Sequence, residues 1–323
     1  MAITLNKIRG MFIGAFLGDG LGFAHEFKCN KNVIFTGLLE HKPFYLSQYQ
    51  GRKEYPIASI SDDTELRLTL LRQIIIDKSY IKDNVILSYM KWANNGNPPI
   101  GKNTRALLKG IKTLKGYQKR IDKVLELPVE KRSQSNGSLM RCSPLSLIWD
   151  NLCVIDDCCI PNPVNCDCNL IYITALRLAL LGNDPITIFN EIKVLAQTKE
   201  VKEVLKQVEN REERNIIENK GWCLHGLYCA LIVMLSFNNY SEAMKWVIGS
   251  HIGSDTDTNA CIAGELLGAV LGYDNLQKEE LTNKNIKILL SAKSDRPKEY
   301  TPTDFIELTE IIYNLLKNGF RDI

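Results

Sequence analysis

Gly253-Ser254-Asp255-Thr256-Asp257-Thr258-Asn259 is the stretch on which our prediction of the fold depends. An almost wholly apolar run follows it directly, from Ala260 to Leu271. This order predicts a buried helix with acids in its first turn, where Asp and Thr oxygens accept hydrogen bonds from unpaired backbone N–H groups. One cap needs one such residue, which Thr258 or Asn259 can supply, so the remaining carboxylates, Asp255 and Asp257, call for another explanation.

A second acidic cluster, Ser59-Ile60-Ser61-Asp62-Asp63-Thr64-Glu65, precedes a helix whose apolar face begins at Leu66. Either cluster alone is more typical of capping than of chemistry. If the two helix starts meet, four carboxylates converge, and like charges that close are costly unless cations or protons compensate them. The four are Asp62, Asp63, Asp255 and Asp257.

Ligands that offer only oxygen favour hard ions such as Mg²⁺, Mn²⁺ or Ca²⁺. Four carboxylates suit two ions that share a bridging acid better than they suit one Mg²⁺, which keeps several waters. Unpaired N–H groups at the two helix starts favour an anion such as a phosphate. We therefore expect a site that binds metal and a phosphate-bearing ligand together.

Helical spacing of apolar residues dominates the rest of the chain, and sustained alternation typical of strands is absent. Glycines at 14, 18, 20 and 22, and again at 264, 268 and 272, suggest that backbones approach closely there. We predict a single all-α domain over residues 1–323, a compact multi-helix bundle, with a long loop over 28–58. The expected helices cover 5–24, a segment from 64 onward, 80–93, 104–114, 170–181, one or two within 186–217, then 222–237, 240–248 and 303–316.

The composition, 45% hydrophobic and 24% charged over 323 residues, is typical of a folded globular chain. A net charge of +3 implies no strong electrostatic partner, and no nucleic acid is expected. No apolar run reaches the roughly 18–20 residues of a membrane helix, and the N-terminus does not resemble a secretory signal. Ten cysteines then indicate mostly reduced thiols, so we expect a cytoplasmic or other reducing intracellular location and a monomer.

Two further clusters each leave two interpretations open. Five cysteines crowd one segment, where plain thiols are favoured over zinc because paired C-x-x-C spacing and nearby histidine are absent; they are Cys153, Cys158, Cys159, Cys166 and Cys168. A basic stretch is either a solvated helix face, the favoured interpretation, or a contact for an anionic substrate. It contains Lys112, Lys115, Lys119, Arg120 and Lys123.

Four ordered motifs, spread over residues 8–273, resemble those of the ADP-ribosylglycohydrolases. They are the N-terminal segment Gly14-Ala-Phe-Leu-Gly18-Asp19-Gly20-Leu-Gly22-Phe-Ala-His-Glu26-Phe27, the metal motif Ser61-Asp62-Asp63-Thr64, the loop Asn136-Gly137-Ser138-Leu139-Met140-Arg141, and Gly253-Ser254-Asp255-Thr256-Asp257-Thr258. Any one motif alone would be a weak signal. Gly221-Trp222 also fits the family pattern.

The resemblance implies an all-α bundle with two Mg²⁺ or Mn²⁺ ions. By position, the implied metal ligands are Ser61, Asp62, Asp63, Asp255, Asp257 and Thr258. Glu26 matches an acidic residue on a mobile loop near the scissile bond, and Glu26, Asp63 and Asp257 are the implied catalytic acids. The implied substrate-binding residues are Asn136, Gly137, Ser138, Met140, Gly253 and Ser254.

The implied activity is metal-dependent hydrolysis of the glycosidic bond between ADP-ribose and an acceptor, most simply a modified protein side chain. An acid among Asp62, Asp63, Asp257 or Glu26 would move the proton. The alternatives are a catalytically inactive ADP-ribose-binding module and a structural Ca²⁺-stabilised domain. Arginine, serine, poly-ADP-ribose and O-acetyl-ADP-ribose linkages all stay open.

The chain departs from the family pattern at four places. Ser61 stands where Thr is usual and keeps a hydroxyl, and Ser254 replaces a glycine before Asp255. Pro99 stands where some members carry an acid, and no histidine is available between residues 152 and 170. An acid or base role at Pro99, and a substrate contact from the missing histidine, are therefore not expected.

Overall fold

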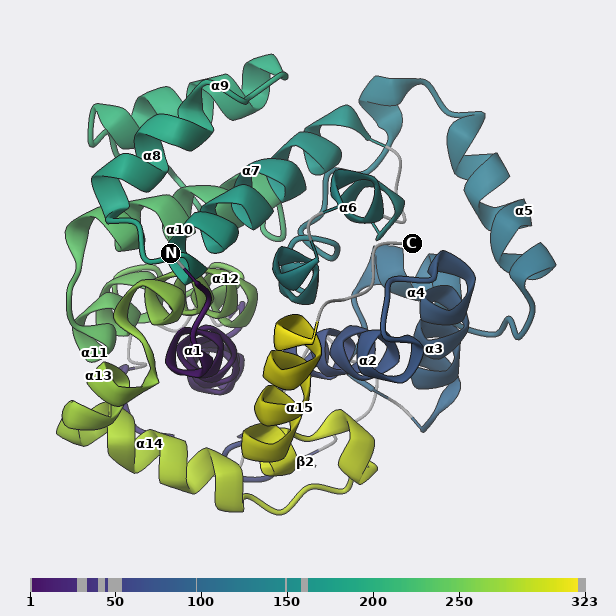
Figure 1. Ribbon diagram of the computed structural model, residues 1–323. Helices are drawn as coiled ribbons and strands as arrows, with labels where there is room; N and C mark the ends of the chain where they lie inside the picture. The colour runs from purple at the N-terminus through teal and green to yellow at the C-terminus, as the bar shows by residue number, and fades with distance from the viewer. Residues whose placement is uncertain are drawn as a thin grey trace.

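The computed structural model describes residues 2–27, 34–39, 44–45, 54–96, 98–148, 150–157 and 162–318, and Figure 1 shows them as packed helices. The all-α prediction is confirmed, with one short antiparallel strand pair in which Phe44 lies opposite Tyr55. The elements are α1 (Leu5–Phe23), β1 (Phe44–Tyr45), β2 (Glu54–Tyr55), α2 (Asp62–Asp77), α3 (Lys82–Asn94), α4 (Lys102–Leu108), α5 (Leu114–Leu125), η1 (Val129–Lys131), η2 (Ser143–Leu147), α6 (Asn151–Asp157), α7 (Pro163–Leu180), α8 (Pro185–Lys193), α9 (Lys199–Glu209), α10 (Cys223–Ser236), α11 (Tyr240–Met244), η3 (Lys245–Gly249), α12 (Thr256–Leu271), α13 (Tyr273–Lys278), α14 (Glu280–Ser291), η4 (Lys298–Tyr300), η5 (Pro302–Asp304) and α15 (Phe305–Lys317).

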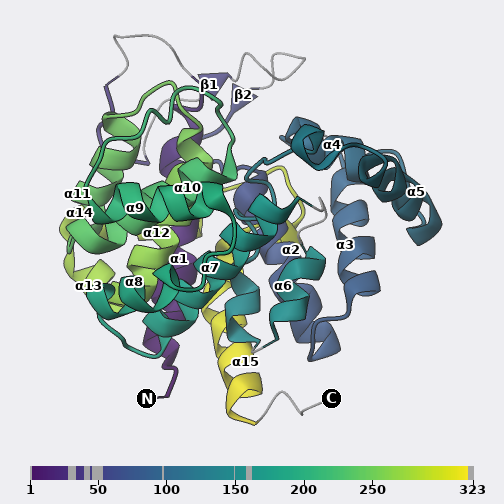
Figure 2. The ribbon, with the colours of Figure 1, turned by 90° about the horizontal axis from the view of Figure 1, so that it is seen from above.

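Helices α1 and α12 form the antiparallel pair at the centre of the molecule (Figures 1 and 2). A Cβ atom added at Gly14 would lie 2.2 Å from the carbonyl oxygen of Gly264, and one at Gly10 would lie 2.3 Å from that of Gly268. The same spacing continues toward the other end, where a Cβ at Gly22 would lie 2.4 Å from the oxygen of Thr256. Because no side chain fits between them, the two backbones are in direct contact and their register is fixed.

The other helices surround this pair. Helices α7 and α10 pack on α12, whereas α13, α14 and α15 pack on α1. Helix α2 contacts both central helices and α15, and α3 packs on its outer side. Helices α4 and α5 pack on α3 and stand at one edge of the molecule, as both views show. The start of α2 is therefore held against the centre from several sides.

Most expected helices are present with boundaries shifted by a few residues, but α7 begins at Pro163 and not at the expected residue 170. The helix expected over 104–114 is wrong in extent: α4 ends at Leu108, Gly110 has φ +80°, and α5 begins at Leu114. Helices α13 and α14 were not expected. His41, Cys158 and Cys159 lie outside the described residues. Over the described ranges, no helix is both long and apolar enough to cross a lipid bilayer. A single domain over 1–323 stays a prediction.

Candidate functional site

The register of α1 and α12 brings the C-terminal end of α1 beside the start of α12 and the start of α2. Asp19 of α1 is fully buried, and its carboxylate accepts hydrogen bonds from the backbone N–H of Ser61 (3.0 Å) and of Thr64 (3.1 Å). At the start of α12, the Thr256 hydroxyl donates to the carbonyl oxygen of Gly22 (2.9 Å). The helix starts that carry the two acidic clusters are thus joined through α1.

The first cluster is connected to the second by hydroxyl groups. Ser61 is the N-cap of α2, and its hydroxyl donates to Asp63 Oδ2 (2.8 Å). Thr258 of α12 donates to the same oxygen at 3.3 Å. The neighbouring Asp62 accepts from the backbone N–H of Gly101, at the start of α4 (3.3 Å).

The acids form two groups that share one member. Ligand oxygens of Asp19, Asp63 and Asp257 lie within 4.8 Å of one another, and so do those of Glu26, Asp255 and Asp257. All five carboxyl groups are buried. Asp257 belongs to both groups, which is the arrangement expected of an acid that bridges two cations.

Burial and mutual repulsion raise the pKa values of these acids. Burial, followed by the charges of Glu26 and Asp255, holds the pKa of Asp257 well above its usual range. Burial and the nearby Asp19 do the same for the pKa of Asp63. Burial, opposed by the hydrogen bond from Gly101, raises the pKa of Asp62 to about 8. Without compensation the cluster is therefore unfavourable when fully ionised.

The donor atoms fit hard divalent cations. Asp63 Oδ1 and Asp257 Oδ1 are buried and accept no hydrogen bond from any described residue. Unpaired buried carboxylate oxygens are costly. Among the described residues, the two acid groups contain carboxylates and no thiol or imidazole. Such a set suits hard divalent cations such as Mg²⁺, Mn²⁺ or Ca²⁺.

One expectation at the start of α12 is wrong. The surplus of polar residues suggested that Thr258 or Asn259 caps the helix. The N-cap is Asp255, whose side chain makes no capping hydrogen bond. Thr258 instead contacts Asp63, and the side chain of Asn259 has no hydrogen-bond partner among the described residues.

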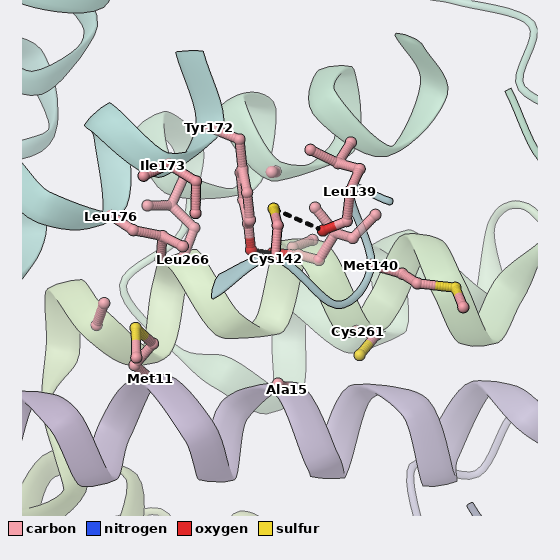
Figure 3. Close-up of a cluster of buried hydrophobic side chains, with 14 of the residues drawn as sticks. Met11, Ala15, Leu139, Met140, Cys142, Tyr172, Ile173, Leu176, Cys261 and Leu266 are labelled. Carbon is pink, nitrogen blue, oxygen red and sulfur yellow. Dashed lines mark hydrogen bonds between the residues drawn. The ribbon is translucent and has the colours of Figure 1, made fainter. Parts of the chain in front are cut away.

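The expected substrate-binding residues occupy two different environments. Asn136 is buried at the site, where its side-chain N–H donates to Asp255 Oδ2 (2.7 Å). Ser138 and Ser254 are buried, with hydroxyls that have no partner among the described residues. Gly137 is half-buried and Gly253 buried with φ +100°. Met140 packs in the hydrophobic core (Figure 3).

An open groove of about 430 Å³ lies beside Asn136. The backbone of Asn136 donates to Gly221 (2.8 Å), and a Cβ added at Gly221 would lie 3.3 Å from Asp255 Oδ2. Lys220 and Trp222 line this groove, and the Lys220 charge favours the ionised form of Asp255. The groove therefore adjoins the second acid group through Gly221, although none of the acids lines it.

A buried arginine connects the elements that surround the site. Arg67, one turn beyond Asp63 on α2, donates to Ser143 Oγ (3.0 Å) and to the Met140 carbonyl, and pairs with Glu265 of α12 (3.1 Å). Figure 3 labels Met140, Cys261 and Tyr172, which lie above α1 in that view. The loop after Asn136 and the two acid-bearing helices are thereby linked through one guanidinium group.

Sequence reasoning did not assign Asp19, although it is the one charged residue between Gly10 and Ala24 of an apolar helix. A single charge within an apolar helix was the signal that could have identified Asp19 as a site residue.

Glu65 of the first acidic cluster does not join the acid groups. Its carboxylate pairs with Arg296 (2.8 Å) and accepts from the Trp92 indole (2.6 Å). Arg141 is buried and pairs with Asp157 (3.3 Å).

Comparisons with known proteins agree with this architecture. The model of the ADP-ribosylglycohydrolase family matches residues 1–293. A protein of Acanthamoeba polyphaga mimivirus, whose name marks it only as a candidate ADP-ribosyl glycohydrolase, is 26% identical over 82% of this chain and 86% of its own length. An ADP-ribosylarginine hydrolase of Pseudomonas putida is 23% identical over 85% of this chain and 73% of its own. The structure of an ADP-ribosylglycohydrolase-related protein complex superposes with a TM-score of 0.65 at 18% identity, covering 97% of this chain and 98% of that one.

Proposed function

Because the chain belongs to the ADP-ribosylglycohydrolase family, we propose that it is a metal-dependent hydrolase that cleaves the glycosidic bond between ADP-ribose and an acceptor. The observation that carries the proposal is the pair of buried acid groups that share Asp257. Two Mg²⁺ or Mn²⁺ ions are the proposed cofactors, held by Asp63, Asp255 and Asp257 with hydroxyls of Ser61 and Thr258 nearby. Asp62 stays a proposed ligand, although its Oδ2 accepts from Gly101.

When bound, such ions would polarise the ribose hydroxyls and a water and offset charge at the acids. The residues of this chain supply the rest. Asn136 holds Asp255 through its amide, and Asp19 holds the start of α2 through two backbone N–H groups. Glu26, which shares the second acid group, is the proposed residue that moves a proton to or from the reacting oxygen. The transition state would be oxocarbenium-like, as in other glycoside hydrolysis.

We further propose an arginine N-glycoside as the linkage. Two relatives, from Pseudomonas putida and Serratia proteamaculans, are named ADP-ribosylarginine hydrolases, at 23% and 21% identity. The test is turnover of arginine-linked, serine-linked, polymeric and O-acetyl substrates side by side with Mn²⁺ present. Preference for the arginine linkage supports the proposal. Preference for another linkage would refute the proposed linkage without contradicting the proposed hydrolase activity.

A further inference from the structure

Residues 102–132, which include α4, α5 and η1, form what we call the cationic arm. The arm contains ten lysines and arginines and three acids, a net charge of +7 in a chain whose total is +3. It stands at one edge of the molecule, where α4 and α5 pack mainly on α3 (Figure 2). The arm is therefore positively charged, whereas the rest of the chain carries a net negative charge.

Both ends of the arm are attached to the acidic site. Gly101, directly before it, donates its backbone N–H to Asp62. Asn136, four residues after it, donates to Asp255. Asn103 and Ser133 join the two ends through a side-chain hydrogen bond of 2.8 Å, and both residues line the groove beside Lys220. The two ends of the arm therefore lie beside the acidic site and this groove.

The basic residues of the arm divide into two roles. Arg120 is structural, because its guanidinium donates to the carbonyls of Ala106 and Lys109 (2.8 Å each) and ties α5 to α4. Lys115, Lys119 and Lys123 are exposed and, among the described residues, make no ion pair or hydrogen bond. Like charges four residues apart destabilise a helix by a few tenths of a kcal/mol per pair. This lysine stripe has no compensating contact within the described chain.

We propose that the cationic arm binds an acidic surface of the protein that carries the ADP-ribose, an inference that rests on the proposed function. Charge complementarity of this kind speeds association and selects partners. Exposed aliphatic side chains follow the stripe, at Leu125 (44%), Leu127 (43%) and Val129 (44%), and would supply apolar contacts beside a charged rim.

A nucleic acid fits the arm less well. Proteins that bind single strands stack bases on exposed aromatic rings, but Tyr117, the single aromatic residue within 102–132, is buried. Asp122 and Glu126 are exposed on the same arm and would repel a continuous phosphate backbone. These features favour an acidic protein face as the partner.

The first test measures binding and needs no turnover. A labelled peptide of alternating glutamate and leucine is titrated with the full-length protein, alongside a matched glutamine–leucine peptide. Wild type is compared with the triple variant Lys115→Gln, Lys119→Gln, Lys123→Gln. The control triple variant Lys199→Gln, Lys202→Gln, Lys206→Gln removes the same charge from exposed positions of α9, on the other side of the molecule.

The acidic peptide should bind wild type and the α9 variant alike and the α5 variant at least about tenfold more weakly, with binding weakened between about 50 and 200 mM salt. Equal binding by all three proteins, or no preference over the glutamine peptide, would overturn the proposal. An oligonucleotide that binds more tightly than the peptide, with the same dependence on the stripe, would overturn the choice of partner.

The second test separates this inference from the proposed function. The ratio of kcat/KM for ADP-ribosylarginine in an acidic peptide to that in a neutral peptide should fall toward one in the α5 variant only. Turnover of the neutral peptide should not change. Absence of all turnover, with stripe-dependent peptide binding intact, would reject the hydrolase and leave the arm's role standing.

Discussion

Replacing Asp257 with asparagine should stabilise the metal-free protein. The Asp257 carboxylate lies within 4.8 Å of ligand oxygens in both acid groups. One pair of unit charges at that distance repels by about 3 kcal/mol at an effective dielectric constant of about 20. Asparagine keeps the shape and removes the charge, so the gain should be largest at a pH where the neighbouring acids are ionised. For a chain of 323 residues, about 3 kcal/mol corresponds to a rise in Tm of roughly 4 °C.

The assay is thermal unfolding at pH 8 with a chelator and then with Mn²⁺. Wild type should gain stability from the metal by mass action, whereas Asp257→Asn should start higher and gain little. Asp274→Asn, which removes an exposed carboxylate at the start of α13, should leave both values as in wild type. A metal-free Asp257→Asn protein less stable than wild type, or one with an undiminished Mn²⁺ shift, would refute the reasoning.

Three further predictions concern the support of the site. Gly14→Ala should destabilise the protein by about 1–3 kcal/mol or more and weaken Mn²⁺ binding, because its Cβ would lie 2.2 Å from the Gly264 oxygen and force α1 from α12. Arg67→Met should cost about 3–5 kcal/mol in urea unfolding, because it leaves the Glu265 carboxylate buried without its partner. Burial lowers the pKa of His225 to about 4, helped by the nearby Arg214. As the pH drops from about 6.5 to 4, the unfolded chain therefore takes up a proton at this histidine before the folded chain does, and the free energy of unfolding should fall.

Each of these has a matched comparison. Gly249→Ala, whose Cβ would meet its nearest neighbour at 3.5 Å, should cost little, and equal losses at Gly14 and Gly249 would contradict the close helix contact. Adding Glu265→Gln to Arg67→Met should recover stability, and no recovery would show that the ion pair is not the cause. His225→Gln should flatten the acid-side loss by up to about 3 kcal/mol, and an unchanged slope would assign that loss to other groups.

The sequence was sufficient for the helical class and for the two acidic clusters, because apolar spacing and paired carboxylates are local patterns. It did not reveal Asp19 as a member of the site, since that depends on the register by which Gly14 meets Gly264. It also suggested caps at Thr258 or Asn259, because local rules cannot show that Thr258 faces Asp63 on another helix. The same limit applies to Glu65, whose partner Arg296 is distant in sequence.

The measurement that tests the central claim most directly is release of free ADP-ribose from an arginine-linked ADP-ribosylated peptide, before and after the metal is removed. Wild type should release ADP-ribose with Mg²⁺ or Mn²⁺, lose that activity with a chelator and regain it when metal is restored, and Asp257→Asn should be inactive throughout. Release that is unaffected by the chelator, or tight ADP-ribose binding without release, would contradict the account.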